Sequence, residues 1–192
     1  MKTVWKIVKI VLIIAFILGL LFLGFFFYVG AHGVNGDHST ADPGEYEAYL
    51  DFVPSSGEFM PSLQNCGAYE KAGLSQREHV QMFLEYQSVC LFLQYSDEEY
   101  ARQKDRIEKA YCFYTEPEGA FLDVSGSFRG YEFRIVRTDD RYTDLKRGKI
   151  IAFNDERKTI LYACYDHNEL DRIDNLEKEM KKILFIPNDW RS

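Results

Sequence analysis

One stretch near the C-terminus, YDHNELDRIDNLE at residues 165–177, spaces acidic and amide side chains as calcium loops do. Counted from Asp166, positions 1, 3, 9 and 12 of such a loop are Asp166, Asn168, Asp174 and Glu177. Position 5 is Leu170, which has no oxygen ligand, and position 6 is Asp171, where the sharp turn requires glycine. The chemistry of this stretch therefore does not favour calcium.

The same stretch belongs to a helical pattern that predicts a helix over residues 168–184. Its apolar residues recur at helical spacing: Leu170, Ile173, Leu176, Met180 and Ile183. A calcium loop would break that periodicity. We expect Asp166 to cap this helix, with acidic first turns at the positive end of its dipole, and Pro187 to follow its end.

Four cysteines are spread along the chain with no CxxC spacing: Cys66, Cys90, Cys112 and Cys164. Zinc-finger and thioredoxin-like sites therefore have no support. An even number of cysteines outside the cytoplasm permits disulfides, and a Cys66–Cys90 or a Cys112–Cys164 pair stays open. Cys90 and Cys164 lie within apolar strand patterns, and we expect all four cysteines to serve in packing.

The four histidines are His32, His38, His79 and His167. His32 and His38 flank Asp37 in a glycine-rich segment, which offers no preorganised metal site. His79 and His167 have no neighbours at ligand spacing. We expect solitary, exposed histidines and no metal site.

Motifs for nucleophilic and phosphate chemistry do not occur in the sequence. In GSFRG, residues 126–130, the serine is second rather than central, so the segment predicts a turn rather than a nucleophile elbow. Asp139 and Asp140 could serve glycoside hydrolysis, but beside Arg137 and Arg141 they are typical of a solvated surface. The sequence therefore assigns no catalytic, cofactor-binding or metal-ligating residue, and no cofactor.

Aromatic residues are abundant, with 13 Tyr and 15 Phe among 192 residues. Eight tyrosines could form an amphipathic binding face: Tyr95, Tyr100, Tyr111, Tyr114, Tyr131, Tyr142, Tyr162 and Tyr165. Half-buried sheets and helices also favour tyrosine. We prefer packing as their role and keep the binding face as the alternative.

An uncharged run at residues 10–29 precedes all of these groups and positions them relative to a membrane. Its twenty residues, IVLIIAFILGLLFLGFFFYV, would span about 30 Å as a helix, the hydrocarbon thickness of a bilayer. The run is apolar all round, which a helix in a soluble core seldom is. We predict a transmembrane helix with the lipid bilayer as its partner.

Charge predicts the orientation of this helix. Lys2, Lys6 and Lys9 precede the run, and no Lys or Arg follows it until Lys71. The positive-inside rule then places the N-terminus in the cytoplasm and the rest of the chain outside. Without those three lysines the chain holds 20 basic and 30 acidic residues, which makes nucleic acid and anionic lipid headgroups unfavourable partners.

The end of the run also resembles a cleavage site. Val29 and Ala31 are small enough for signal peptidase, so cleavage after Ala31 stays open. Signal peptides, however, have apolar regions of about 7–15 residues, shorter than this one. We favour an uncleaved signal-anchor over residues 1–30, in a single-pass protein of the cell membrane.

The remaining chain divides into a linker and one domain. Residues 31–44, AHGVNGDHSTADPG, are rich in glycine and predict a flexible stalk. Residues 45–192 predict one extracytoplasmic α+β domain, and there is no internal repeat. Residues 45–53 have the spacing of a short amphipathic helix.

Within this domain, strands are predicted at residues 89–95, 121–124, 131–136, 149–153 and 159–165, with a turn at 125–127. Residues 75–87 are ambiguous: Ser75 and Glu78 form a capping-box pattern that suggests a helix, but the alternating apolar residues after them favour extended structure weakly. Ser96 and Glu99 form a capping box that begins a helix to about Tyr111. This order predicts a small antiparallel sheet of about 4–5 strands with helices packed on one face.

Two segments carry a resemblance: LQYSDEEYARQKDRIEKAY and FNDERKTILYACYDHNELDRI, within residues 88–176. They are similar to an uncharacterised group of small membrane-anchored bacterial proteins. The resemblance implies a bacterial cell envelope and the α+β fold. It implies no activity.

Three functions remain compatible with these patterns. We favour a non-enzymatic extracytoplasmic domain that binds a ligand or an envelope protein. The alternatives are a surface hydrolase with Asp or Glu as acid and base, and a small accessory subunit that acts through its helix in a membrane complex.

Overall fold

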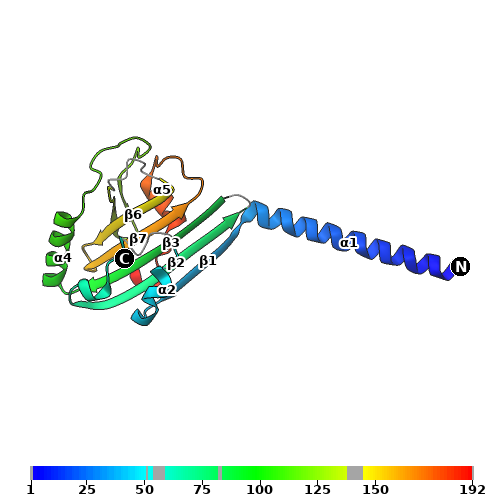
Figure 1. The fold of residues 1–192 in the computed structure, drawn as a ribbon, viewed down its shortest axis with the longest axis horizontal. Helices are drawn as coiled ribbons and strands as arrows, with labels where there is room; N and C mark the ends of the chain where they lie inside the picture. Colours follow the sequence, from blue (N-terminus) through cyan, green and yellow to red (C-terminus); the bar gives the residue numbers. More distant parts are fainter. Residues whose placement is uncertain (1, 51, 54–58, 82–83, 138–144, 192) are drawn as a thin grey trace.

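A long helix leads into one antiparallel sheet with helices on both of its faces (Figure 1). The computed structural model describes residues 2–50, 52–53, 59–81, 84–137 and 145–191. Helix α1 (Lys2–His32) is followed, after Gly33 alone, by the first strand. Its stretch Trp5–His32 is long and apolar enough to cross a membrane, as an anchor or a signal sequence would be.

The sheet has seven strands, all paired antiparallel, in the order β1-β2-β3-β7-β6-β5-β4. They are β1 (Val34–Thr40), β2 (Tyr69–Gln81), β3 (Leu84–Tyr95), β4 (Ser125–Phe128), β5 (Tyr131–Ile135), β6 (Arg147–Asn154) and β7 (Thr159–His167). The α+β class is confirmed, but the expected 4–5 strands were too few. The two edge strands, β1 and β4, account for the excess, because neither has an alternating apolar pattern.

Strand β1 occupies much of the segment expected to be a flexible stalk. Residues 34–40 pair with β2 in continuous register, from Val34 opposite Val80 to Thr40 opposite Leu74. Arg77 on β2 also donates from Nε and Nη2 to the two carboxylate oxygens of Asp37, at 2.7 and 2.8 Å. Backbone pairing and this ion pair, rather than apolar side chains, define the strand, so its sequence resembles a linker.

The hairpin β4–β5 differs from its predicted form. The predicted strand at 121–124 is absent; its backbone N–H groups at Leu122 and Asp123 instead donate to the Ile173 carbonyl at 2.9 and 3.1 Å. The predicted turn at 125–127 lies in β4. The turn falls at Arg129 and Gly130, both with positive φ, as two-residue hairpins of type I′ require.

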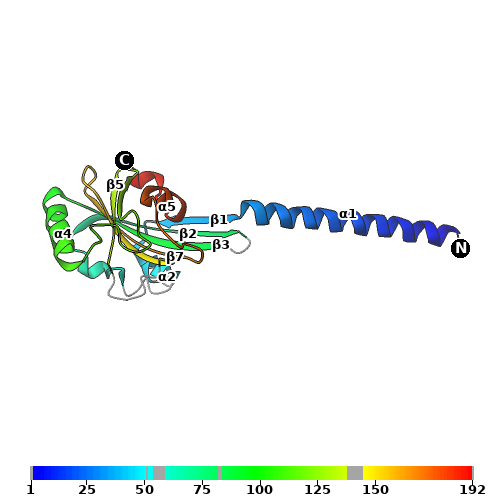
Figure 2. The same cartoon turned by 90° about the horizontal axis from the view of Figure 1, so that it is seen from above.

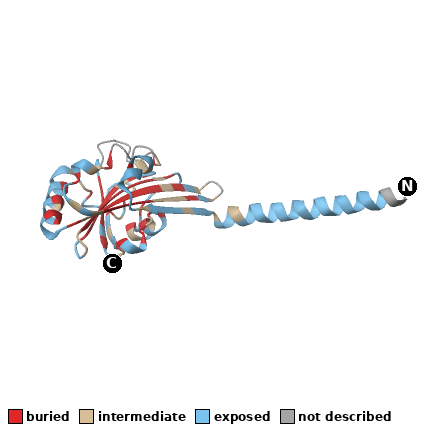
Figure 3. Ribbon diagram, turned by 90° about the horizontal axis from the view of Figure 1, so that it is seen from below, coloured by how far each residue is buried: buried red, intermediate tan, exposed pale blue. Residues whose placement is uncertain are grey.

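Helices cover both faces of the sheet, rather than the single face expected (Figure 2). Helix α5 (Leu176–Ile183) packs Leu176, Met180 and Ile183 on one face. Helices α2 (Tyr46–Leu50) and α4 (Asp97–Ala110) pack on the other. Strands β3, β6 and β7 are therefore buried on both faces and read as continuous apolar runs (Figure 3).

Helix α4 confirms its predicted start, because the Ser96 side chain accepts the Glu99 backbone N–H. Within the described ranges, short 3₁₀ turns also occur at Pro43–Glu45, Leu63–Asn65 and Asn188–Trp190.

Helix α5 is much shorter than the predicted 168–184. Asp166 lies in β7 and caps nothing; Asn175 is the N-cap and accepts the Lys178 N–H at 2.7 Å. Pairing of β7 with β3 continues to His167, opposite Tyr86, which keeps the chain extended there. Leu170 and Ile173 are buried as predicted, but from a loop.

The C-terminal carbonyls of α5 are satisfied by polar side chains of the sheet. Arg77 Nη1 donates to the carbonyls of Lys181 and Lys182 at 3.2 and 3.0 Å. The hydroxyl of Ser88 donates to Ile183 and that of Ser75 to Phe185, both at 2.6 Å. These contacts explain the two fully buried serines and fix the end of α5 over β2 and β3.

Candidate functional site at the end of helix α1

The end of helix α1 is held directly against strand β2. Gly33 has φ +71° and is so close to β2 that a Cβ there would lie 2.5 Å from Cε1 of His79. Gln81 Nε2 donates to the Ala31 carbonyl at 2.5 Å. Only glycine fits at position 33, because it needs both the left-handed backbone and the close approach.

Four side chains form a row across neighbouring strands at this end of the sheet. Asn35 of β1 is opposite His79 of β2, which is opposite Tyr86 of β3, which is opposite His167 of β7. The ring centroids of His79 and Tyr86 are 4.7 Å apart, and those of Tyr86 and His167 are 5.4 Å apart, both stacked. The Nδ1 of His79 lies 2.5 Å from the Asn35 side-chain oxygen.

This row forms part of the wall of an open cleft of about 470 Å³, which we call the α1-proximal cleft. Besides the three rings it is lined by residues of three kinds: apolar Leu84 and Leu170; acidic Glu169, Asp171 and Glu179; and polar or basic Gln81, Arg172 and Lys182. It combines stacked rings with charges of both signs. A polar ligand that carries both charges would match it.

His167 is the most enclosed titratable group of the cleft, at 6% exposure. Burial lowers the pKa of its imidazole, against a raising effect of Glu179. The ring is therefore neutral at pH 7. Its Nδ1 accepts the Glu169 backbone N–H at 3.3 Å, so Nε2 carries the proton and is a donor. That Nε2 has no hydrogen-bond partner within the described parts of the chain.

Charged groups around the cleft differ in how far they are paired. Lys182 contacts Glu179 at 3.1 Å and Arg172 contacts Asp174 at 2.9 Å. Glu169 and Asp171 are exposed, and neither forms an ion pair with another described residue. The cleft therefore has carboxylates that could bind a cation and a histidine N–H that could donate to an oxygen of a ligand.

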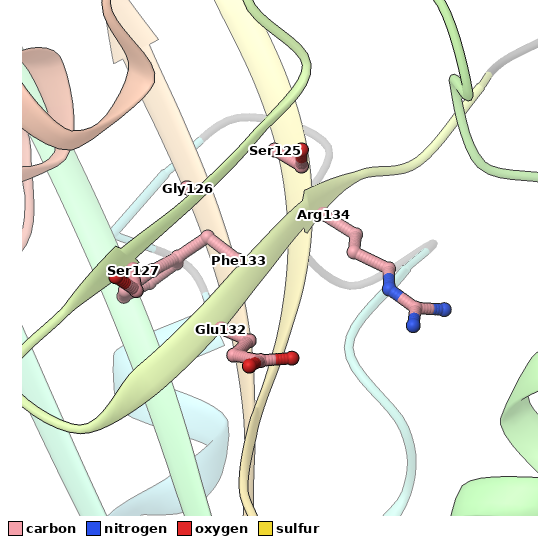
Figure 4. A pocket seen from close by; sticks show the side chains of 6 residues that line it. All are labelled: Ser125, Gly126, Ser127, Glu132, Phe133 and Arg134. Carbon is pink, nitrogen blue, oxygen red and sulfur yellow. The ribbon is translucent and has the colours of Figure 1, made fainter.

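A second hollow, of about 370 Å³, lies on the outer face of the β4–β5 hairpin. Figure 4 shows its lining side chains from Ser125 to Arg134, with Arg134 extending away from the strand pair. The Arg134 guanidinium is already bound to Glu108 at 3.2 Å. These groups do not converge on one point, so this hollow is the weaker candidate.

The residues with the calcium-like spacing do not share a common centre, because their side chains bind different partners. Asp166 pairs with Arg147 at 2.9 Å, and the Asn168 side chain accepts the Glu85 N–H at 2.9 Å. Glu177 pairs with Lys181. No group of three metal-ligating side chains occurs among the residues that the structure describes.

All four cysteines are free thiols, so neither Cys66–Cys90 nor Cys112–Cys164 is bridged. Cys66, Cys90 and Cys164 are buried, which confirms packing as their role, whereas Cys112 is exposed. Burial raises the pKa of the thiol to about 11 for Cys66 and to about 12 for Cys90 and Cys164.

The expectation of exposed histidines was wrong for two of the four. His79 and His167 are buried, at 8% and 6% exposure, while His32 and His38 are exposed. No local signal marks the buried pair, because their neighbours come from other strands. Asp139 and Asp140, on which a hydrolase was considered, lie outside the described residues.

Most of the tyrosines pack inside the domain. Six of the eight considered are buried: Tyr95, Tyr100, Tyr114, Tyr131, Tyr162 and Tyr165. Packing is thus confirmed as their role, and an exposed tyrosine face is not formed by these six. The tyrosine that does line the α1-proximal cleft, Tyr86, was not among them.

Comparison of this chain with known protein families, with curated proteins and with solved structures found no match. The resemblance to membrane-anchored bacterial proteins therefore stays a prediction from the sequence.

Proposed function

We propose that this chain is a single-pass membrane protein whose α+β domain is held at the extracytoplasmic surface and binds a ligand there without catalysis. The α1-proximal cleft is the binding site of this proposal. One observation carries it: α1 is apolar and unburied along its length, yet its last residues are bound to the sheet beside the cleft.

The exposure of α1 supports a bilayer as its environment. Phe16, Leu21 and Phe22 are each at least 64% exposed. In water, such exposure of apolar side chains along a whole helix would be unfavourable because of the hydrophobic effect. Trp5 precedes the apolar run and Tyr28 lies near its end, about 35 Å apart along the axis, as the aromatic belts of membrane helices do. Lys9 lies 5.4 Å from the Trp5 ring, at the end assigned to the cytoplasm.

The junction supports an uncleaved anchor over a signal peptide. Ala31, after which cleavage would fall, lies within α1, and its carbonyl is bound by Gln81. The contact of Gly33 with His79 adds to this fixed geometry. A domain tied to the helix in this way stays at the membrane rather than on a long tether.

The cleft supports binding as the activity. Its histidine donor, His167, lies on β7 and is oriented by the sheet before any ligand arrives, which lowers the entropy lost on binding. Helix α4 lies at the end of the domain opposite α1 (Figure 1), and none of its residues lines the cleft. Binding and anchoring thus share one end of the molecule.

The test is expression of the full chain in a bacterial host, followed by membrane fractionation, protease treatment of intact cells and mass measurement of the N-terminal fragment. We expect an intact segment 1–29 in the membrane fraction and a domain digested from outside. A chain that begins at His32 in the medium would contradict the anchor. Protection of the domain in intact cells would contradict the orientation.

A further inference from the structure

The position of the α1-proximal cleft along the helix axis is set by a short piece of backbone. From Val29, where the apolar run ends, to Gly33 the helix rises about 6 Å. His79 packs on Gly33, and Gln81 binds the Ala31 carbonyl. The headgroup layer of a leaflet is about 5–7 Å thick. In a chain anchored by α1, one wall of the cleft therefore lies at the outer level of the headgroups.

The cleft offers donors for a phosphate group. His167 Nε2–H lacks a partner among the described residues, and the ring lines the cleft. Lys182 and Arg172 also line the cleft, each with a side chain about half or more exposed. A phosphate oxygen accepts from all three kinds of donor.

The cleft also offers acceptors for an ammonium group. Glu169 and Asp171 are exposed at its rim and unpaired within the described chain. Three carboxylates against two fixed cations give the lining a small excess of negative charge. A purely anionic ligand would meet net repulsion, whereas a zwitterion satisfies both sets of groups.

We propose that the α1-proximal cleft binds the phosphoethanolamine headgroup of a phospholipid in the outer leaflet. This inference rests on the proposed function, because only an anchored chain brings the cleft to the headgroups. The phosphate accepts from His167 and the basic residues, and the primary ammonium donates to Glu169 and Asp171. A choline headgroup fits less well, since its trimethylammonium has no N–H to donate.

The experiment follows the imidazole Hε1 resonances of His79 and His167 in the full chain, kept in detergent micelles. The histidine signals are assigned with His32→Gln and His38→Gln. The probes are short-chain phosphatidylethanolamine, phosphatidylcholine and phosphatidylglycerol, with free phosphoethanolamine and inorganic phosphate as soluble comparisons. We expect a saturable shift with phosphatidylethanolamine and an affinity at least about tenfold lower for the other lipids, the difference that 1.4 kcal/mol makes.

Substitutions can distinguish the contribution of Glu169 and Asp171 to lipid binding from that of the negative net charge of the chain. Glu169→Gln with Asp171→Asn should weaken phosphatidylethanolamine binding by about tenfold, because the ammonium then meets neutral amide oxygens and loses its attraction to two carboxylates. The matched control is Glu98→Gln with Asp105→Asn on α4, two exposed carboxylates lost far from the cleft. It should bind as the unchanged chain does.

Three results would overturn the proposal. They are no saturable shift with phosphatidylethanolamine, equal affinity for phosphatidylcholine, and free phosphoethanolamine binding as tightly as the lipid, which would indicate a soluble ligand. Each would leave the anchored topology standing, because fractionation and protease treatment test that separately.

Discussion

At the scale of single residues, the tertiary environment sets the chemistry of the cysteines and histidines. Residue type alone suggests reactive thiols and titrating imidazoles. Burial removes most of that reactivity, because a thiolate or an imidazolium loses its hydration inside a packed sheet. Cys112 and His38, in contrast, remain exposed.

Thiol modification should distinguish Cys112 from the other cysteines. Treatment of the native full chain with N-ethylmaleimide at pH 7.5 should add one label, because burial and a raised pKa keep Cys66, Cys90 and Cys164 protonated and covered. In denaturant all four should react. Intact mass measures the number of labels, and Cys112→Ser should reduce the native value to zero. Fewer than four in denaturant would point to a disulfide.

Stability should depend on pH through His167. Burial depresses its pKa in the folded state below the ordinary value near 6.5. The unfolded chain therefore takes up a proton first as pH falls, so this contribution is complete above about pH 6.5 and is lost below it. Glu179 and Glu169 raise that pKa and so reduce the effect, whereas Lys182 lowers it and adds to the effect.

The check is thermal unfolding of the full chain between about pH 7 and 5, above the range where carboxylates take up protons. His167→Gln should flatten the fall in melting temperature. His38→Gln, an exposed histidine of β1, should keep the slope of the unchanged chain. Equal slopes in all three proteins would rule out His167 as the group responsible.

At the scale of elements, close contacts between neighbouring strands fix features that no apolar pattern marks. β1 is held by its register with β2 and by Asp37. In β6, Gly148 leaves room for the ring of Tyr165 on β7, which lies across it. A glycine inside a strand often marks such a close approach.

Gly148→Ala should destabilise the domain. The added Cβ would lie 2.0 Å from Cε1 of Tyr165, whose fully buried ring has little room to move. We expect a loss of about 1–3 kcal/mol in the free energy of unfolding, as for other overpacked cores. Gly36→Ala in β1 is the control, since its Cβ would meet nothing closer than 4.0 Å. Denaturant unfolding measures both, and similar losses would contradict the role of the Tyr165 contact.

At the scale of the whole molecule, the connection between α1 and the sheet determines the position of the domain relative to the end of α1. With only Gly33 between helix and strand, the cleft cannot move far from the end of α1. A flexible linker would remove that constraint while leaving the domain intact.

Insertion of about eight glycine and serine residues between Gly30 and Ala31 should separate the cleft from the membrane surface, since such a linker behaves as a flexible coil. The contacts of Ala31 and Gly33 with β2 stay in place. In nanodiscs with spin-labelled headgroups, the His79 and His167 signals should be broadened in the unchanged chain and sharper in the insertion variant. Equal broadening would mean that the junction does not position the cleft.

Much of this molecule follows from local sequence patterns. The apolar helix, the cap at Ser96, strands β3, β5, β6 and β7, and the α+β class all have signals within a few residues of themselves. Hydrophobic periodicity and capping act over one or two turns, so they can be read without the rest of the chain. The same holds for the buried cysteines in β3 and β7.

Other features depend on partners distant in the sequence. β1 is a strand because β2 lies beside it, 44 residues away at the Asn35–His79 pair. Helix α5 begins late because β7 stays paired with β3 as far as His167. The row of His79, Tyr86 and His167 joins three strands whose order only the folded sheet fixes. The sequence by itself determined the long apolar helix and the class of fold, whereas the cleft arose from long-range pairing, which no local pattern encodes.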